Sequence, residues 1–208
     1  MRTLKQPRAR ETRERILREA ARLFALKGYH DTKLKEVLRA AEVTTGAFFH
    51  HFQNKDDMGF AVVDRHMEQR KRDLDAIEER MPPPPGDDPL EQVFRRLDAV
   101  REMVASRQRK KGGCVIGNLS TALADTHPEF RKRLAKCFDE MAREFTPLLD
   151  AAAEKLGTQR SADTLELSRH IVTIIEGAIM LSRTHRDPGL VDRQFRLLKE
   201  YLRAIFGN

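Results

Sequence analysis

Two short helical patterns that follow each other closely constrain the fold of this chain more than any other feature. Apolar side chains recur at helical spacing over residues 34–41, which predicts a helix of about two turns. Thr32 precedes this helix and offers a hydroxyl that suits an N-cap. After a tight turn at Glu42 and Val43, Thr44 is expected to cap a further short helix.

A longer helix precedes this pair, and another helix follows it. Apolar residues predict the first helix from about Arg8 to Lys27, and Gly28 stands where a left-handed cap would end it. The segment from Asn54 to Asp57 starts the later helix with acidic residues, as the helix dipole favours. A tight turn between the second and third helices matches the helix-turn-helix motif, which places its second element in the major groove of DNA. We therefore expect a DNA-binding domain over residues 1–54.

The positive charge of the chain is concentrated near its beginning. Residues 1–35 hold eleven Lys or Arg and four Asp or Glu, and the net charge of the whole chain is +7, so the remaining charges cancel. A basic N-terminal arm with Arg2, Lys5, Arg8 and Arg10 would favour approach to phosphates and make binding depend on salt. Taken alone, the charge run also fits a solvated basic tail without a partner. The three-helix pattern beside it favours DNA.

The rest of the chain is predicted to be helical. A length of 208 residues suits a small domain followed by a larger one, and 40% hydrophobic with 34% charged residues fits amphipathic helices rather than disorder. We expect an all-α fold, with a C-terminal helical bundle over residues 55–208. The helices are expected to be separated at Pro82–Gly86, Gly112–Gly113, Asp125–Pro128 and Gly157–Asp163, with proline at the first helical position in Asp88–Pro89 and an interruption at Pro147.

Several classes of protein do not fit the sequence. The longest stretch without charge, Gly112–Ala124, has 13 residues and contains polar ones, so no membrane span is expected. Because the N-terminus has no apolar signal region either, we expect a cytoplasmic protein. Cys114 and Cys137 are too few for a disulfide framework, and neither has Cys or His neighbours at zinc spacing. We expect no metal and no other cofactor.

Three segments together carry a resemblance to a known family. Thr12–Leu17, Leu23–Tyr29 and Gly46–Lys55 resemble the DNA-binding domain of TetR/AcrR-type transcriptional repressors. The resemblance covers roughly residues 10–60 and becomes one of general architecture beyond that range. It implies a homodimer that binds a palindromic double-stranded DNA operator and responds to a small molecule, with residues 55–208 as the domain for ligand binding and dimerisation.

The resemblance also implies which residues of the third helix contact DNA. Thr44, Thr45 and Gly46 open this recognition helix, where base edges and backbone are nearest. Phe49 and His51 fall where the family usually has a tyrosine and a phosphate-contacting histidine. For His51, a place in the core is the alternative.

Further phosphate contacts and two core positions follow from the same pattern. Lys55 at the start of the fourth helix is expected to reach phosphate, as are Thr12 and Thr32 through hydroxyl or backbone donors at helix starts. Phe48 and Phe52 are expected to pack into the small core.

Three positions depart from the family pattern. Glu42 stands where the family often has glycine, and a left-handed residue there costs on the order of 1 kcal/mol. Phe49 lacks the tyrosine hydroxyl, so one phosphate hydrogen bond is lost. Thr45 replaces a common lysine and offers a hydroxyl and a methyl group that suits a thymine.

The last two helices carry more apolar surface than a pair facing water needs. A self-complementary dimer interface would bury this surplus, and two-fold symmetry suits a palindromic operator. In the resembled family the corresponding helices form a four-helix dimer interface, and the same is implied here. Gly177 either permits close approach of two helices in that interface or packs inside a monomer. The apolar positions are Leu167, Ile171, Ile174, Ile175, Ala178 and Ile179, and then Val191, Phe195, Leu198, Leu202 and Ile205.

Cys114 is the clearest indication in the sequence of what the C-terminal domain responds to. It follows a glycine pair and is expected near a helix start, and Lys110 and Lys111 lie close by in the chain. A helix N-terminus and positive charge favour the reactive thiolate. The segment resembles that of repressors that respond to electrophiles, which makes Cys114 a candidate sensor. The alternative is a small buried structural residue, as Cys137 is expected to be.

A noncovalent inducer is the other possible input, with Asn118, His127, Glu176 and Arg183 as conceivable polar anchors. Cys114, His127 and Asp125 have no nucleophile motif, phosphate loop or metal cluster beside them, so we do not expect an enzyme. The sequence therefore predicts a ligand-responsive transcriptional repressor. An architectural DNA-binding protein without ligand control is the alternative.

Overall fold

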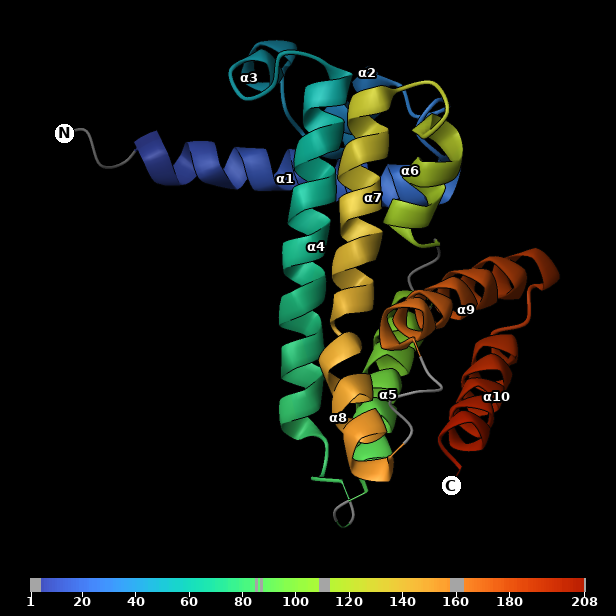
Figure 1. The fold of residues 1–208 in the computed structure, drawn as a ribbon. Helices are drawn as coiled ribbons and strands as arrows, with labels where there is room; N and C mark the ends of the chain where they lie inside the picture. Colours follow the sequence, from blue (N-terminus) through green and yellow to red (C-terminus); the bar gives the residue numbers. More distant parts are fainter. Residues whose placement is uncertain (1–4, 85, 87, 109–112, 158–162, 208) are drawn as a thin grey trace. The chain divides into compact units, whose positions relative to one another are not determined.

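The computed structural model describes residues 5–84, 86, 88–108, 113–157 and 163–207, and these form helices and connecting turns (Figure 1). The all-α prediction is confirmed for the described residues. The helices are α1 (Lys5–Lys27), α2 (Leu34–Ala40), α3 (Thr45–Phe49), α4 (Lys55–Arg80), α5 (Pro89–Gln108), α6 (Val115–Leu123), α7 (Pro128–Arg143), α8 (Thr146–Leu156), α9 (Thr164–His185) and α10 (Gly189–Phe206).

The chain divides into two compact units that do not coincide with two continuous stretches of sequence. The first unit comprises Met1–Arg70 and Cys114–Leu134. The second comprises Lys71–Gly113 and Ala135–Asn208. The first unit therefore contains α1, α2, α3 and α6 together with the starts of α4 and α7.

In the first unit, local capping sets the helix ends around α2 and α3. Gly28 adopts a left-handed φ of 80° after α1, as predicted, and its N–H donates to the carbonyl of Phe24 at 3.0 Å. The Oγ1 of Thr44 accepts from the N–H of Ala47 at 3.2 Å, which confirms the predicted cap of α3. Glu42 has a φ of 53° and is thus the left-handed residue of the tight turn.

The predicted N-cap of α2 was wrong. Lys33 holds that position, and its N–H donates to the carboxylate of Glu36 at 3.1 Å. Thr32 is fully buried, and its hydroxyl donates to the carbonyl of Gly28 at 2.7 Å. The hydroxyl thus closes the turn between α1 and α2 and satisfies the Gly28 carbonyl, a contact that sequence spacing could not reveal.

In the second unit, α5, α8, α9 and α10 pack around one apolar core, and α9 and α10 lie side by side (Figure 1). The predicted breaks are confirmed where the structure describes them. Pro89 begins α5, the Oδ1 of Asp88 accepts from the N–H of Leu90 at 2.9 Å, and Pro147 lies in the first turn of α8. Lys110, Lys111 and Gly112 lie outside the described residues. The largest core side chains include Leu74, Leu90, Leu97, Phe145 and Phe195.

An arginine with a side chain that is 13% exposed connects three segments of the second unit. The guanidinium of Arg96 lies 2.9 Å from the carboxylate of Glu78 and 3.2 Å from that of Glu144. Burial opposes its charge, but these two carboxylates more than compensate and raise the pKa of Arg96. The end of α4, the middle of α5 and the end of α7 are thereby held to one another.

Candidate DNA-binding interface

The recognition helix α3 has one buried face and one exposed face. Phe48 is fully buried and Phe52 is 3% exposed, so both belong to the core, as predicted. On the other face, the side chains at positions 44 and 45 and the backbone at 46 are exposed. Because Gly46 has no side chain, a partner's backbone can approach α3 closely there.

Phe49 lies on the exposed face and is unusually open for an aromatic residue. It is 56% exposed, and its ring meets that of Phe48 edge to face, with centroids 5.3 Å apart. An exposed phenylalanine offers a flat apolar surface and no hydrogen-bond donor. It therefore suits contact with a thymine methyl or a sugar rather than a phosphate hydrogen bond.

His51 is half-buried just after α3. Burial lowers the pKa of its imidazole, and the nearby charges of His50 and Arg13 lower it further. Arg13 comes from α1, and its guanidinium lies 5.4 Å from the centre of the Phe52 ring. Sequence reasoning did not single out Arg13, since nothing in the spacing of α1 distinguishes it from the other arginines of that helix.

Lys55 begins α4, but its side chain turns toward the loop after α1. Its Nζ donates to the carbonyl of Tyr29 at 2.6 Å and lies 4.1 Å from the centre of the Tyr29 ring. Burial lowers the pKa of Lys55, while the carboxylates of Asp56 and Asp31 act in the opposite direction. The hydroxyl of Tyr29 donates to the Oδ1 of Asp56. Burial and this carboxylate both raise the pKa of Tyr29.

The two remaining residues predicted to contact phosphate lie elsewhere than expected. Thr12 is in the third turn of α1, because that helix begins at Lys5, so its backbone N–H belongs to the helix and only its hydroxyl remains as a donor. Both donors of Thr32 are engaged within the protein, because its N–H also donates to the carbonyl of Tyr29 at 3.2 Å. The structure gives no support to a phosphate contact by Thr32.

Three of the predicted ligand residues, Cys114, Asn118 and His127, belong to the first unit. Cys114 is the N-cap residue of α6 and is half-buried, which confirms its predicted place at a helix start. The Nδ2 of Asn118 donates to the carbonyl of Ala25 at 3.0 Å, so this amide connects α6 to α1. The Nδ1 of His127 lies 2.8 Å from the Oγ1 of Thr126.

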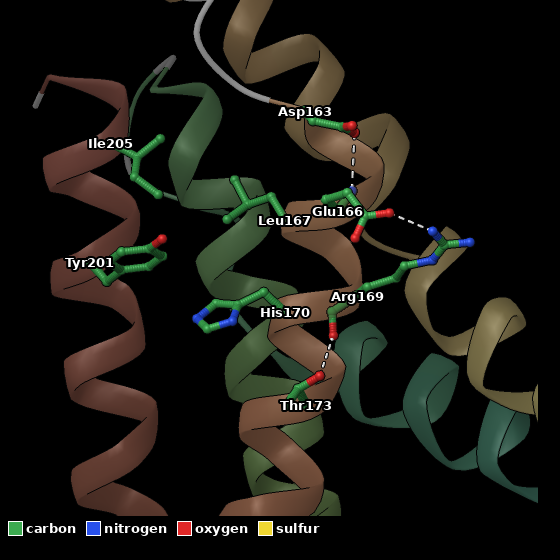
Figure 2. Close-up of a pocket in the computed structure, with 8 residues that line it drawn as sticks. All are labelled: Asp163, Glu166, Leu167, Arg169, His170, Thr173, Tyr201 and Ile205. Atoms are coloured by element: carbon green, nitrogen blue, oxygen red, sulfur yellow. Dashed lines mark hydrogen bonds and ion pairs between the residues drawn. The ribbon is translucent and has the colours of Figure 1, made fainter.

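The other two, Glu176 and Arg183, lie on α9 in the second unit. Arg183 packs against Gly113 so closely that a Cβ added there would lie 2.3 Å from its Nη1. A groove of about 670 Å³ lies between α9 and α10, and neither Glu176 nor Arg183 lines it. In that groove, the rings of His170 and Tyr201 point toward one another with centroids 5.4 Å apart (Figure 2). Its walls are formed by Asp163, Glu166, Leu167, Arg169, His170, Thr173, Tyr201 and Ile205.

Large apolar side chains are exposed on the same two helices. On α9, Met180 is 60% and Leu181 is 41% exposed, and on α10, Leu197 is 52% and Tyr201 is 47% exposed. Most of the residues predicted for this surplus are instead buried in the core, so the exposed apolar surface of these helices lies on other residues. The buried ones are Leu167, Ile171, Ile175, Ala178, Val191, Phe195, Leu198 and Leu202. Added bulk at Gly177 would meet open space.

Within the described residues, none of the helices is long and apolar enough to cross a membrane. The same part of the chain contains no group of three or more His, Cys, Asp or Glu side chains placed to hold a metal ion. A helix-turn-helix with an exposed recognition helix, followed by a larger helical unit, defines the class of DNA-binding transcriptional regulators.

Comparison with known proteins gives the family. The family model described as bacterial regulatory proteins, tetR family, matches residues 16–62, and that of the tetracyclin repressor-like C-terminal domain matches residues 89–198. The chain belongs to the TetR family of transcriptional regulators. Members of this family are DNA-binding proteins without enzymatic activity, in agreement with the sequence-based prediction.

Relatives extend this similarity to nearly the whole chain. An uncharacterized HTH-type transcriptional regulator in the lacX 3′ region of Lactococcus lactis subsp. lactis is 28% identical over 191 residues, covering 91% of this chain and 92% of the relative. The HTH-type transcriptional repressor DhaR of Mycobacterium sp. (strain GP1) is 22% identical over 190 residues, covering 91% of each. The crystal structure of a TetR transcriptional regulator from Chloroflexus aurantiacus matches with a TM-score of 0.77 and 26% identity, covering 94% of this chain and 96% of that one.

Proposed function

We propose that this regulator is a repressor that binds a palindromic operator as a homodimer and is released by a small-molecule inducer. The exposed face of α3 at Thr44, Thr45 and Gly46, held by buried Phe48 behind it, is the observation that carries the proposal. The similarity to a protein named as a repressor supports the direction of control. Because its proposed partner is operator DNA and the matching family model describes bacterial regulatory proteins, its proposed place of action is the cytoplasm.

In the proposed complex, the residues around α3 have different tasks. Thr44, Thr45 and Gly46 face base edges, and Phe49 packs beside them. His51 and Lys55 bind phosphates. These contacts fix the orientation of the DNA-binding domain, here called the head, without reading the base sequence. The hydroxyl of Thr12 contributes a further phosphate contact, and residues 1–54 provide the predicted DNA-binding domain.

Gel-shift titration with a duplex that the wild-type protein has selected from a random-sequence library tests these assignments. His51→Ala and Lys55→Ala are expected to weaken binding while leaving the helix content unchanged by circular dichroism. Lys132→Ala is a matched control, because the Lys132 side chain is 73% exposed on α7. Unaltered affinity of both head variants would defeat the assignment.

The proposed dimer forms through α9 and α10. The exposed apolar residues on these helices support it, since large apolar patches on a surface usually mark an interface. Size-exclusion chromatography with light scattering is expected to give the mass of two chains at micromolar concentration. Leu197→Glu is expected to give one chain, whereas Leu26→Glu, at a leucine 40% exposed on α1, is expected to leave the dimer intact. A monomeric wild-type protein would refute this part of the proposal.

For the inducer, we propose attack of the Cys114 thiolate on an electrophilic compound. Cys114 is half-buried and precedes the N-terminus of α6, an environment that favours a thiolate. Cys114→Ser is then expected to bind DNA yet fail to release it when an alkylating compound is added, whereas Cys137→Ser behaves as the wild type. Normal release by Cys114→Ser would point instead to a noncovalent ligand, with Asn118, His127, Glu176 and Arg183 as candidate anchors.

Release requires that the inducer bind one arrangement of the dimer more tightly than another, since only differential affinity shifts an equilibrium. We propose that the induced arrangement of the regulatory domain holds the two heads at the wrong separation for adjacent half-sites. An architectural DNA-binding protein would bind the selected duplex equally well with every compound tested.

A further inference from the structure

The first turn of α4 contains a conflict of charge. Lys55, which we propose binds a DNA phosphate, is followed directly by Asp56. A free carboxylate next to this ammonium would attract it and would also repel the phosphate. The usefulness of Lys55 therefore depends on where the carboxylate of Asp56 is held.

The structure describes a specific partner for that carboxylate. The hydroxyl of Tyr29 donates a part-buried hydrogen bond to the Oδ1 of Asp56, which stands 27 residues further along the chain. A carboxylate that accepts such a bond has part of its charge satisfied and its position fixed. Tyr29 is only 4% exposed, so little of this residue is open to water.

The position of the Tyr29 ring is set by packing on several sides. Phe24 lies with its centroid 5.1 Å away, and Phe130 of α7 meets the ring edge to face at 5.6 Å. Gly59 of α4 completes this packing: a Cβ there would lie 3.4 Å from the Tyr29 ring and 2.7 Å from Phe130. Tyr29 is therefore a rigid element fixed by α1, α4 and α7.

The same residue also guides Lys55. Its ammonium donates to the Tyr29 carbonyl at 2.6 Å and lies over the Tyr29 ring, 4.1 Å from its centre. An ammonium has three N–H donors, and among the described residues only this carbonyl accepts from Lys55. The other donors can serve a phosphate. Asp31 is the second carboxylate whose charge acts on Lys55, and its side chain is exposed to solvent, where screening weakens it.

We propose that Tyr29 is a positioning residue for DNA binding: its hydroxyl holds the Asp56 carboxylate so that the Lys55 ammonium stays available to phosphate. The proposal rests on the proposed function, in which Lys55 contacts DNA. Without the hydroxyl, the unbound Asp56 oxygen captures the ammonium in an internal ion pair.

The salt dependence of DNA binding is the readout, because it counts phosphate contacts and a loss of stability alone does not change it. We would measure binding of the full chain to the selected duplex by fluorescence anisotropy at several salt concentrations. Tyr29→Phe is expected to lower affinity about tenfold, as for the loss of one charged hydrogen bond. It is also expected to reduce the slope of log K against log salt by about 0.9 for each bound head.

Removing the Asp56 carboxylate separates the positioning role of Tyr29 from its role in packing. The double variant Tyr29→Phe with Asp56→Asn is expected to regain the wild-type slope, since nothing then captures Lys55. An unchanged slope in Tyr29→Phe, or no recovery in the double variant, overturns the proposal. If Tyr29→Phe does not fold, Asp56→Glu replaces it, because the longer side chain reaches Lys55 and the same loss of slope is expected.

Lys55→Ala distinguishes this inference from the proposed function on which it rests. It is expected to reduce the slope by about 0.9 for each bound head, and Tyr29→Phe is expected to add no further reduction in that background. If Lys55→Ala leaves the slope unchanged, its proposed phosphate contact is wrong, and the role of Tyr29 is overturned with it. If Lys55→Ala reduces the slope and Tyr29→Phe does not, only the positioning role is refuted. Lys132→Ala is expected to keep the wild-type slope.

Discussion

The orientation of α3 predicts opposite effects for two neighbouring phenylalanines. Phe48 is fully buried, with the ring of Phe52 5.5 Å from its own, whereas Phe49 is 56% exposed. Replacing a fully buried phenylalanine by alanine removes its burial and leaves a cavity, which costs about 3–5 kcal/mol. Phe49→Ala loses only an edge contact and part of its burial, so its cost is expected to stay below about 1 kcal/mol.

Hydrogen exchange of the α1–α3 amides measures this difference in the first unit, since the chain has two compact units that need not unfold together. Phe48→Ala is expected to accelerate exchange strongly throughout α1–α3. Phe49→Ala is expected to leave exchange nearly unchanged and to weaken binding to the selected duplex. Equal protection in the two variants, or greater loss in Phe49→Ala, would refute the orientation of α3 described above.

Three further predictions follow from other parts of the molecule. Glu42→Gly should stabilise the first unit by up to about 1 kcal/mol, because it relieves a left-handed φ of 53°, and a decrease in stability measured by hydrogen exchange would contradict this. Burial lowers the pKa of His51 below its ordinary value of 6.5 in the free protein, and a bound phosphate would raise it, so DNA binding takes up a proton. Affinity should therefore increase as the pH falls from the pKa of His51 in the complex toward its lower pKa in the free protein. His51→Gln should lose this component, while a variant at exposed His185 keeps it. Gly113→Ala should displace Arg183, whose Nη1 would lie 2.3 Å from the new Cβ, and an unmoved Arg183 side chain in a crystal structure of the variant would exclude this.

The sequence was most informative where structure is decided locally. Gly28 and Thr44 were identified as helix caps, and Pro89 as a helix start, because the conformational preference of each residue acts within one turn. The two-turn pattern of α2 and the buried places of Phe48 and Phe52 follow from helical periodicity in the same way.

The errors and omissions lie in contacts between distant residues. Thr32 had the right chemistry for a cap, but its hydroxyl donates to the Gly28 carbonyl in the preceding turn. The pairs Tyr29 with Asp56 and Asn118 with Ala25 are 27 and 93 residues apart, and periodicity carries no information on such pairs. Candidate ligand anchors chosen for their polarity alone, such as Asn118, could therefore not be distinguished from residues that join helices.

Selection of DNA from a random-sequence library by the full chain tests the central claim most directly, namely that α3 reads operator bases in a symmetric dimer. The wild-type protein is expected to enrich a palindrome with half-sites about one helical turn apart or a multiple of it. Thr45→Ala should change the preferred bases at one position of each half-site while retaining the symmetry. A pool without enrichment, a motif without two-fold symmetry, or an identical motif with Thr45→Ala would each contradict the account.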